Sequence, residues 1–169
     1  MRERVVTGLY AGVLFVVLGS LAWATGRAFL FPSLGPSAFV LAFHTRETRA
    51  PAGRIVGAHT IGALAGFLAH SLFASGVVIT GALAPFDPAG LRLAASAIVS
   101  IVLTSWGMLG TEAIHAPACA TTLIVSLGLL STPSEVGLIV VSVVLLVAVH
   151  TGAVRAARRR PNAGFLSTR

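Results

Sequence analysis

The chain contains no lysine, a single cysteine and only five acidic residues among 169, and each shortage excludes a class of protein. One cysteine, Cys119, cannot form an intrachain disulfide. Five scattered acids leave few ligands for a metal and little material for a pair of catalytic carboxylates. Glycine-rich phosphate loops, CxxC pairs and HExxH motifs are also missing. We therefore expect no metal, no cofactor and no enzymatic activity.

Charge is scarce throughout. Charged residues make up 10% of the chain, against roughly 25% in ordinary globular proteins, and the mean hydropathy is +0.92. Such a chain is expected to cross a lipid bilayer several times. The net charge of +7 comes from twelve arginines that lie mostly in loops and termini, as membrane topology requires, so no nucleic-acid partner is expected. The uncharged runs are Val5–Thr25, Ala28–Ala42, Ile55–Phe86, Leu93–Thr111, Ala113–Ser134 and Val136–Val154.

The first apolar run has features of a secretory signal peptide. Met1–Arg4 precedes it, and Ala22-Trp23-Ala24 imitates a cleavage site. The apolar stretch exceeds the length of about 7–15 residues that signal peptides use, which favours a membrane helix that stays in the protein.

The two halves of the chain resemble each other at an offset of 80–83 positions. Trp23 matches Trp106, Pro36 matches Pro117, Val56-Gly57 matches Val136-Gly137, and His70 matches His150. Each half is predicted to hold a long apolar helix, a short Pro-broken segment and a second long helix. We expect one all-α membrane domain over residues 1–169, with repeat A at about 5–84, repeat B at about 91–155 and a basic cytoplasmic tail at 156–169.

The arginine distribution predicts how many segments cross the membrane. If both short segments cross, ten arginines face the cytoplasm and only Arg27 and Arg92 face outside; if neither crosses, the division is eight to four. The first arrangement agrees better with the positive-inside rule. It places both termini in the cytoplasm and makes the three-segment repeats inverted, an organisation common in transporters.

The two Pro-broken segments are the expected site of function. Pro is favoured at the start of a helix, so we expect half-helices starting at Pro36 and Pro117 near mid-membrane. Gly35 is expected to supply the turn before Pro36. With inverted topology the two N-termini approach each other, and the free amides of Ser37, Ala38 and Phe39 would converge with those of Ala118, Cys119 and Ala120. Helix N-termini with free N–H groups bind anions. The alternative is that both prolines merely kink continuous helices.

Histidines near these segments add candidate donors. His115 precedes the second half-helix, where it would donate to an anion, carry a proton or bond to backbone. His59 lies on the second long helix, where its repeat counterpart is Ile139; a polar side chain at this depth usually has a partner inside the bundle. Glu112 is expected to pair with His115 or with an arginine. A thiol enzyme built on Cys119, with His115 as its base, is a weaker alternative.

Small residues four positions apart occur at Gly8/Gly12 and at Gly62/Gly66. Such pairs let two helix backbones approach closely, either within the chain or between two copies. Six short crossings offer a small wall around an aqueous path, so we expect a homo-oligomer.

At these segments the sequence resembles the HPP family of small integral membrane proteins. The resemblance rests on Leu34-Gly35-Pro36-Ser37-Ala38, Gly57-Ala58-His59 followed by Gly62-Ala63-Leu64, and His115-Ala116-Pro117-Ala118. Ala116 departs from the family's His-Pro-Pro motif. The resemblance implies four transmembrane helices and, from some plant and cyanobacterial members, an association with nitrite transport.

We expect a plasma-membrane transporter or channel for a small monovalent inorganic anion, nitrite first; the alternative is a scaffold or sensor subunit that transports nothing. The expected substrate-binding residues are Ser33, Gly35, Pro36, Ser37, Ala38, His59, His115, Pro117, Ala118, Cys119, Thr121 and Thr122.

Overall fold

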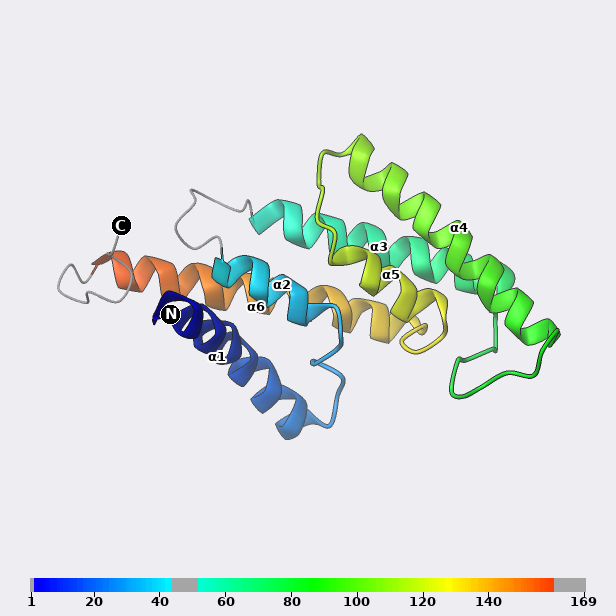
Figure 1. The fold of residues 1–169 in the computed structure, drawn as a ribbon, viewed down its shortest axis with the longest axis horizontal. Coiled ribbons are helices and arrows are strands. Elements are labelled where there is room, and N and C mark those ends of the chain that lie inside the picture. Colours follow the sequence, from blue (N-terminus) through cyan, green and yellow to red (C-terminus); the bar gives the residue numbers. More distant parts are fainter. Residues whose placement is uncertain (1, 44–51, 160–169) are drawn as a thin grey trace.

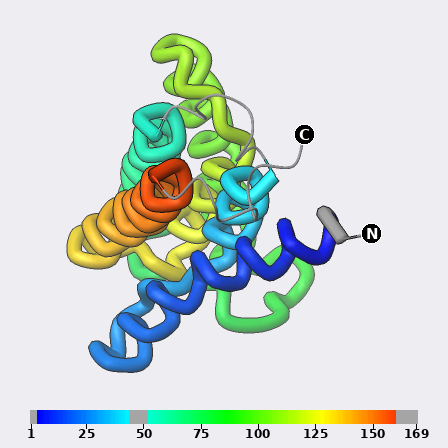
Figure 2. Tube along the Cα trace, turned by 90° about the vertical axis from the view of Figure 1, so that its left-hand side faces the viewer, coloured from blue at the N-terminus to red at the C-terminus, as the bar shows by residue number. Residues whose placement is uncertain are grey.

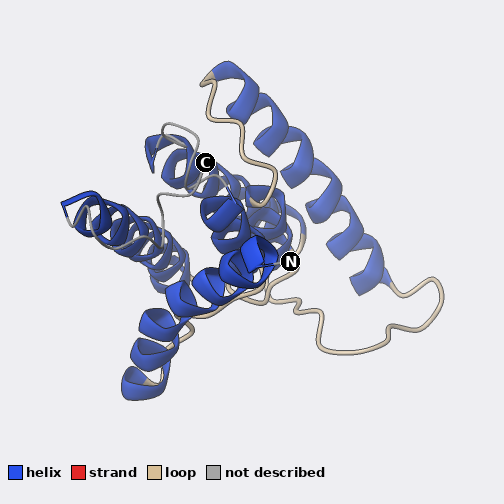
Figure 3. Ribbon diagram, turned by 60° about the vertical axis from the view of Figure 1, so that its left-hand side comes forward, coloured by secondary structure: helices blue, strands red, loops and turns tan. Residues whose placement is uncertain are grey.

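The computed structural model describes residues 2–43 and 52–159, which form six helices and no strands (Figures 1 and 3). The loop holding Arg46 and Arg49, and the predicted basic tail from residue 160 onward, lie outside the described residues. Four helices are long and two are short. They are α1 (Arg2–Thr25), α2 (Leu34–Phe43), α3 (Ala52–Phe73), α4 (Pro88–Gly110), α5 (Ala118–Ser126) and α6 (Pro133–Arg159).

The four long helices are long and apolar enough to cross a membrane, which confirms the predicted number of long spans. Their apolar stretches have 22 to 27 residues, and a helix needs about 20 residues to cross the hydrocarbon core at 1.5 Å per residue. The short helices have 10 and 9 residues. Each is therefore about half the length of a crossing.

Both short helices are separate elements preceded by non-helical chain, residues 26–33 before α2 and 111–117 before α5. The predicted short, separate helices are therefore present, and the alternative of continuous helices kinked at both prolines is wrong. Pro117 stands immediately before α5, close to the predicted start, but α2 begins at Leu34 and Pro36 is its third residue. An early start is tolerated because the first-turn N–H that proline lacks has no partner within the helix.

The helices of the two halves interleave. α3 packs against α4 and α5 of the other half, and α6 packs against α1 and α2 of the first half. α3 and α6 also pack against each other and lie side by side in Figure 2, with α1 crossing obliquely. α2 and α5 run in opposite directions from starts near the centre of the molecule (Figure 1).

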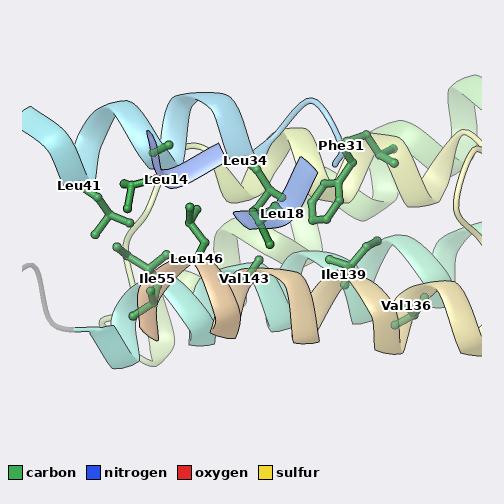
Figure 4. Close-up of a cluster of buried hydrophobic side chains, with 14 of the residues drawn as sticks. Leu14, Leu18, Phe31, Leu34, Leu41, Ile55, Val136, Ile139, Val143 and Leu146 are labelled. Carbon is green, nitrogen blue, oxygen red and sulfur yellow. The ribbon is translucent and has the colours of Figure 1, made fainter. Parts of the chain in front are cut away.

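The largest buried apolar cluster joins the first half to α6 (Figure 4). Leu14 and Leu18 of α1 and Leu34 of α2 meet Val143 and Leu146 of α6, and all five are almost completely buried. α2 therefore packs against α6 through apolar side chains.

Glycines set a much closer contact between α3 and α5. A Cβ on Gly62 would lie 2.8 Å from the carbonyl oxygen of Ala118, and one on Gly66 would lie 2.6 Å from that of Thr122. The Gly62/Gly66 pair therefore packs helices within the chain. Gly8 and Gly12 have no atom within 4 Å of an added Cβ, so in the described residues no helix packs on that pair.

Candidate functional site

The N-terminal ends of α2 and α5 contact each other through side chains. The hydroxyl of Ser33, just before α2, lies 2.6 Å from the hydroxyl of Thr121 on α5, and both residues are fully buried. The predicted approach of the two short helices is therefore present, and it occurs inside the protein.

His59 bridges the two short helices with its two ring nitrogens. Its Nε2 lies 2.9 Å from Ser37 Oγ on α2, and its Nδ1 lies 2.7 Å from Thr121 Oγ1 on α5. Ser37 and Thr121 are each the fourth residue of their short helix. One buried imidazole thus joins two hydroxyls at corresponding positions, which explains why a polar side chain occupies the middle of α3.

His115 completes the cluster from the chain before α5. Its Nε2 lies 3.0 Å from Ser37 Oγ, and its ring centroid lies 5.3 Å from that of His59. Ser37 Oγ also lies 3.1 Å from the carbonyl oxygen of Ser33. We call Ser33, Ser37, His59, His115 and Thr121 the polar junction.

The distances fix the hydrogens of the polar junction when both imidazoles are neutral. A carbonyl oxygen only accepts, so Ser37 donates to Ser33 and receives N–H bonds from His59 Nε2 and His115 Nε2. His59 Nδ1 then accepts from the Thr121 hydroxyl, which in turn accepts from the Ser33 hydroxyl. The result is a closed ring of four residues with His115 attached at Ser37.

The backbone amides do not converge as predicted. The N–H groups of Ala118, Cys119 and Ala120 donate to the carbonyls of residues 115, 116 and 117 in the turn that leads into α5. Ser37, Ala38 and Phe39 are the fourth to sixth residues of α2, beyond its first three, because that helix starts early. The donors at this place are therefore side chains.

The remaining candidate residues shape the junction and add no polar side chain to it. Ala38 and Ala118 are buried against their neighbours, and Cys119 packs in an apolar cluster with Ala58, Met108 and Ala118. Gly35 was expected to supply the turn before Pro36, and this is wrong. It lies in α2, its φ is outside the positive range, and an added Cβ would meet no atom within 4 Å.

Thr122 belongs to a second contact that the sequence analysis missed. Its hydroxyl lies 2.8 Å from the hydroxyl of Thr104 on α4 and 3.2 Å from the carbonyl oxygen of Ala118. On the predominantly apolar helix α4, Ser96, Ser100 and Thr104 recur every four residues, and all three are buried. That spacing places them on one face, and it was the signal available in the sequence.

His70 and His150 lie away from the polar junction. In the last turn of α3, His70 Nε2 bonds to the Val77 carbonyl oxygen at 3.0 Å and so ties the end of the helix to the chain that follows it. His150 is not at a helix end, because α6 continues to Arg159, and its Nδ1 lies 3.1 Å from the Tyr10 hydroxyl on α1. Both histidines fasten neighbouring segments of the bundle.

Four helices long and apolar enough to cross a membrane, together with a buried polar junction, define a multi-span membrane protein. Residues 1–161 match the family described as HPP, transmembrane region, and the chain belongs to this family. No curated protein and no solved structure matches the chain.

Proposed function

We propose that the protein transports a small monovalent anion across the membrane and that the polar junction is its binding site. The observation that supports this most is the meeting of two opposed short helices at a buried cluster of hydroxyl and imidazole donors. Nitrite is the first candidate, because the family resemblance points to it. The proposal involves passage of the ion and no chemical conversion.

The composition of the junction favours an anion over a cation. Its side chains are three hydroxyls and two imidazoles, and none of the described hydrogen bonds to them comes from a carboxylate. The positive ends of the α2 and α5 dipoles both lie at this place, and each favours negative charge. A monovalent anion has the lowest dehydration cost, which suits a site that offers mostly neutral donors.

Every buried side-chain nitrogen and oxygen in the described chain already has a hydrogen-bond partner. An anion would enter by replacing one of the internal bonds of Ser37, Thr121 or His115. Each of these donors would then bond to the anion in place of its internal acceptor, so the exchange leaves no donor unsatisfied.

The arrangement of helices also suits transport. We infer that residues 2–73 and 88–159 are two inverted repeats, because the short helices run in opposite directions and the third helix of each half packs on the other half. Inverted repeats with broken helices at mid-membrane are frequent in transporters. The starts of α1 and α3 and the end of α6 would then face the cytoplasm.

A flux assay tests the proposal directly. Purified protein in liposomes should take up nitrite faster than protein-free liposomes, and nitrate, formate and chloride should show whether the site selects among small anions. Thr121→Val removes a hydroxyl of the junction at nearly constant volume, whereas Ser20→Ala removes an exposed hydroxyl that bonds only to its own helix. Equal flux in both variants would contradict the assigned site, and a stable complex without flux would favour a scaffold.

A further inference from the structure

One imidazole nitrogen in the polar junction has no bond. His59 uses both ring nitrogens, but His115 uses only Nε2, and its Nδ1 has no partner in the described chain. Every fully buried side-chain nitrogen in the described chain has a hydrogen-bond partner. Because His115 Nδ1 has none, this atom is not fully buried. With Nε2 donating to Ser37, the neutral ring carries a free lone pair on Nδ1.

Resting on the anion transport proposed above, we propose that His115 accepts a proton on Nδ1 and that one proton accompanies each anion through the protein. The proton comes from water on the side of uptake and converts the neutral ring to an imidazolium. The anion binds beside it, and both leave on the opposite side. His115 returns to the neutral form, and no net charge crosses.

Protonation at this nitrogen leaves the rest of the junction intact. The Nε2–H continues to donate to Ser37, which continues to donate to the Ser33 carbonyl. Protonation of His59 at Nδ1 would instead remove the acceptor for the Thr121 hydroxyl. His115 is therefore the proton carrier and His59 the positioning residue.

The anion and the proton stabilise each other, because each one alone would be an unpaired charge removed from water. An isolated buried ion is costly, whereas a hydrogen-bonded pair of opposite charges is much less so. No acidic side chain in the described chain forms a hydrogen bond or an ion pair with His115, so the anion itself serves as the counterion. The titratable or charged groups on the surrounding elements are His59, His70 and exposed Arg54 on α3, Cys119 on α5, Arg92 on α4 and exposed Glu112 after it, with none on α2.

The test measures protons and anions together in liposomes that hold a pH-sensitive dye, with potassium and valinomycin setting the membrane potential. Nitrous acid crosses bilayers unaided, so the rate in protein-free liposomes is subtracted, and nitrate provides a second substrate whose acid is fully dissociated. We expect about one proton per anion and no effect of an imposed potential on the rate. When the outside is one pH unit more acidic than the liposome interior, nitrate should accumulate inside to about tenfold its outside concentration.

His115→Gln keeps a donor toward Ser37 but cannot be protonated, and it should abolish proton movement and the response to the pH difference. His70→Gln makes the same replacement outside the junction and should retain both. Flux in the unmodified protein that follows the membrane potential and carries no protons would overturn the inference while leaving anion transport standing. So would proton movement in His115→Gln equal to that in the parent. Absence of any flux above protein-free liposomes would instead refute the transport proposal itself.

Discussion

Gly62 lies directly against Thr122, so closely that a Cβ on the glycine would be 2.7 Å from the threonine Oγ1. Thr122 is held by Thr104 and by the Ala118 carbonyl. The hydroxyl cannot move away without breaking these bonds.

Gly62→Ala should therefore destabilise the protein by about 1–3 kcal/mol, as overpacking of a tight interior does. Thermal unfolding in detergent measures this. Gly35→Ala places the same methyl group on α2, where it meets no atom within 4 Å, and should leave the midpoint essentially unchanged. A larger loss at Gly35 than at Gly62 would contradict the described packing of α3 on α5.

Ser37 and Thr121 should be energetically coupled, although neither is bonded to the other, because both bond to His59. In a double-mutant cycle, Ser37→Ala and Thr121→Val should deviate from additivity by roughly 0.5–3 kcal/mol in the free energy of unfolding. Ser96→Ala combined with Ser37→Ala gives the comparison, since Ser96 bonds to the Ser126 carbonyl outside the junction. Additivity in both cycles would mean that His59 does not join the two helices.

Cysteine labelling distinguishes six crossings from four. In a Cys119→Ala background, single cysteines are placed at the exposed positions Arg4, Ala52 and Ala84. A membrane-impermeant reagent should label the first two from one side of the membrane and the third from the other side. This result follows if the chain from Gly26 through α2 returns across the bilayer. Labelling of Arg4Cys and Ala52Cys from opposite sides would show that α2 re-enters the membrane and leaves on the side it came from.

The uncovered Gly8/Gly12 pair on α1 predicts where copies of the chain associate. Only 11% of the apolar window of α1 is buried, and neither glycine contacts another described helix. We expect an oligomer in mild detergent, with Gly12→Leu shifting its mass toward the monomer by blocking close backbone approach. Gly53→Leu, at the exposed start of α3, should leave the mass unchanged; a parent protein that is monomeric would remove the expectation.

The sequence predicted the elements better than their contacts. Runs of uncharged residues and two prolines were enough to locate four long and two short helices. They did not place the start of α2, because proline is tolerated at several positions of the first turn and the sequence does not show which of them Pro36 occupies. The predicted turn at Gly35 is wrong for the same reason.

The sequence predicted which residues belong to the polar junction but not which of them bond to one another. Ser33, Ser37, His59, His115 and Thr121 were all candidates, since polar side chains in apolar helices need partners. Which nitrogen meets which hydroxyl depends on how far α3 sits from α5, and Gly62 sets that distance. The expected free amides are absent for two reasons. The N–H groups of residues 118–120 donate to carbonyls in the turn before α5, and residues 37–39 lie beyond the first three residues of α2.

The two short helices are held with unequal firmness. α3 lies against α5 backbone to backbone at Gly62 and Gly66, whereas α2 and α6 meet through the leucine and valine side chains of the large apolar cluster. Interlocked backbones resist sliding, while a layer of leucine and valine allows it. For the transport proposed above we therefore expect α1 and α2 to move more readily than α5, so amide exchange should be faster in α2 than in α5.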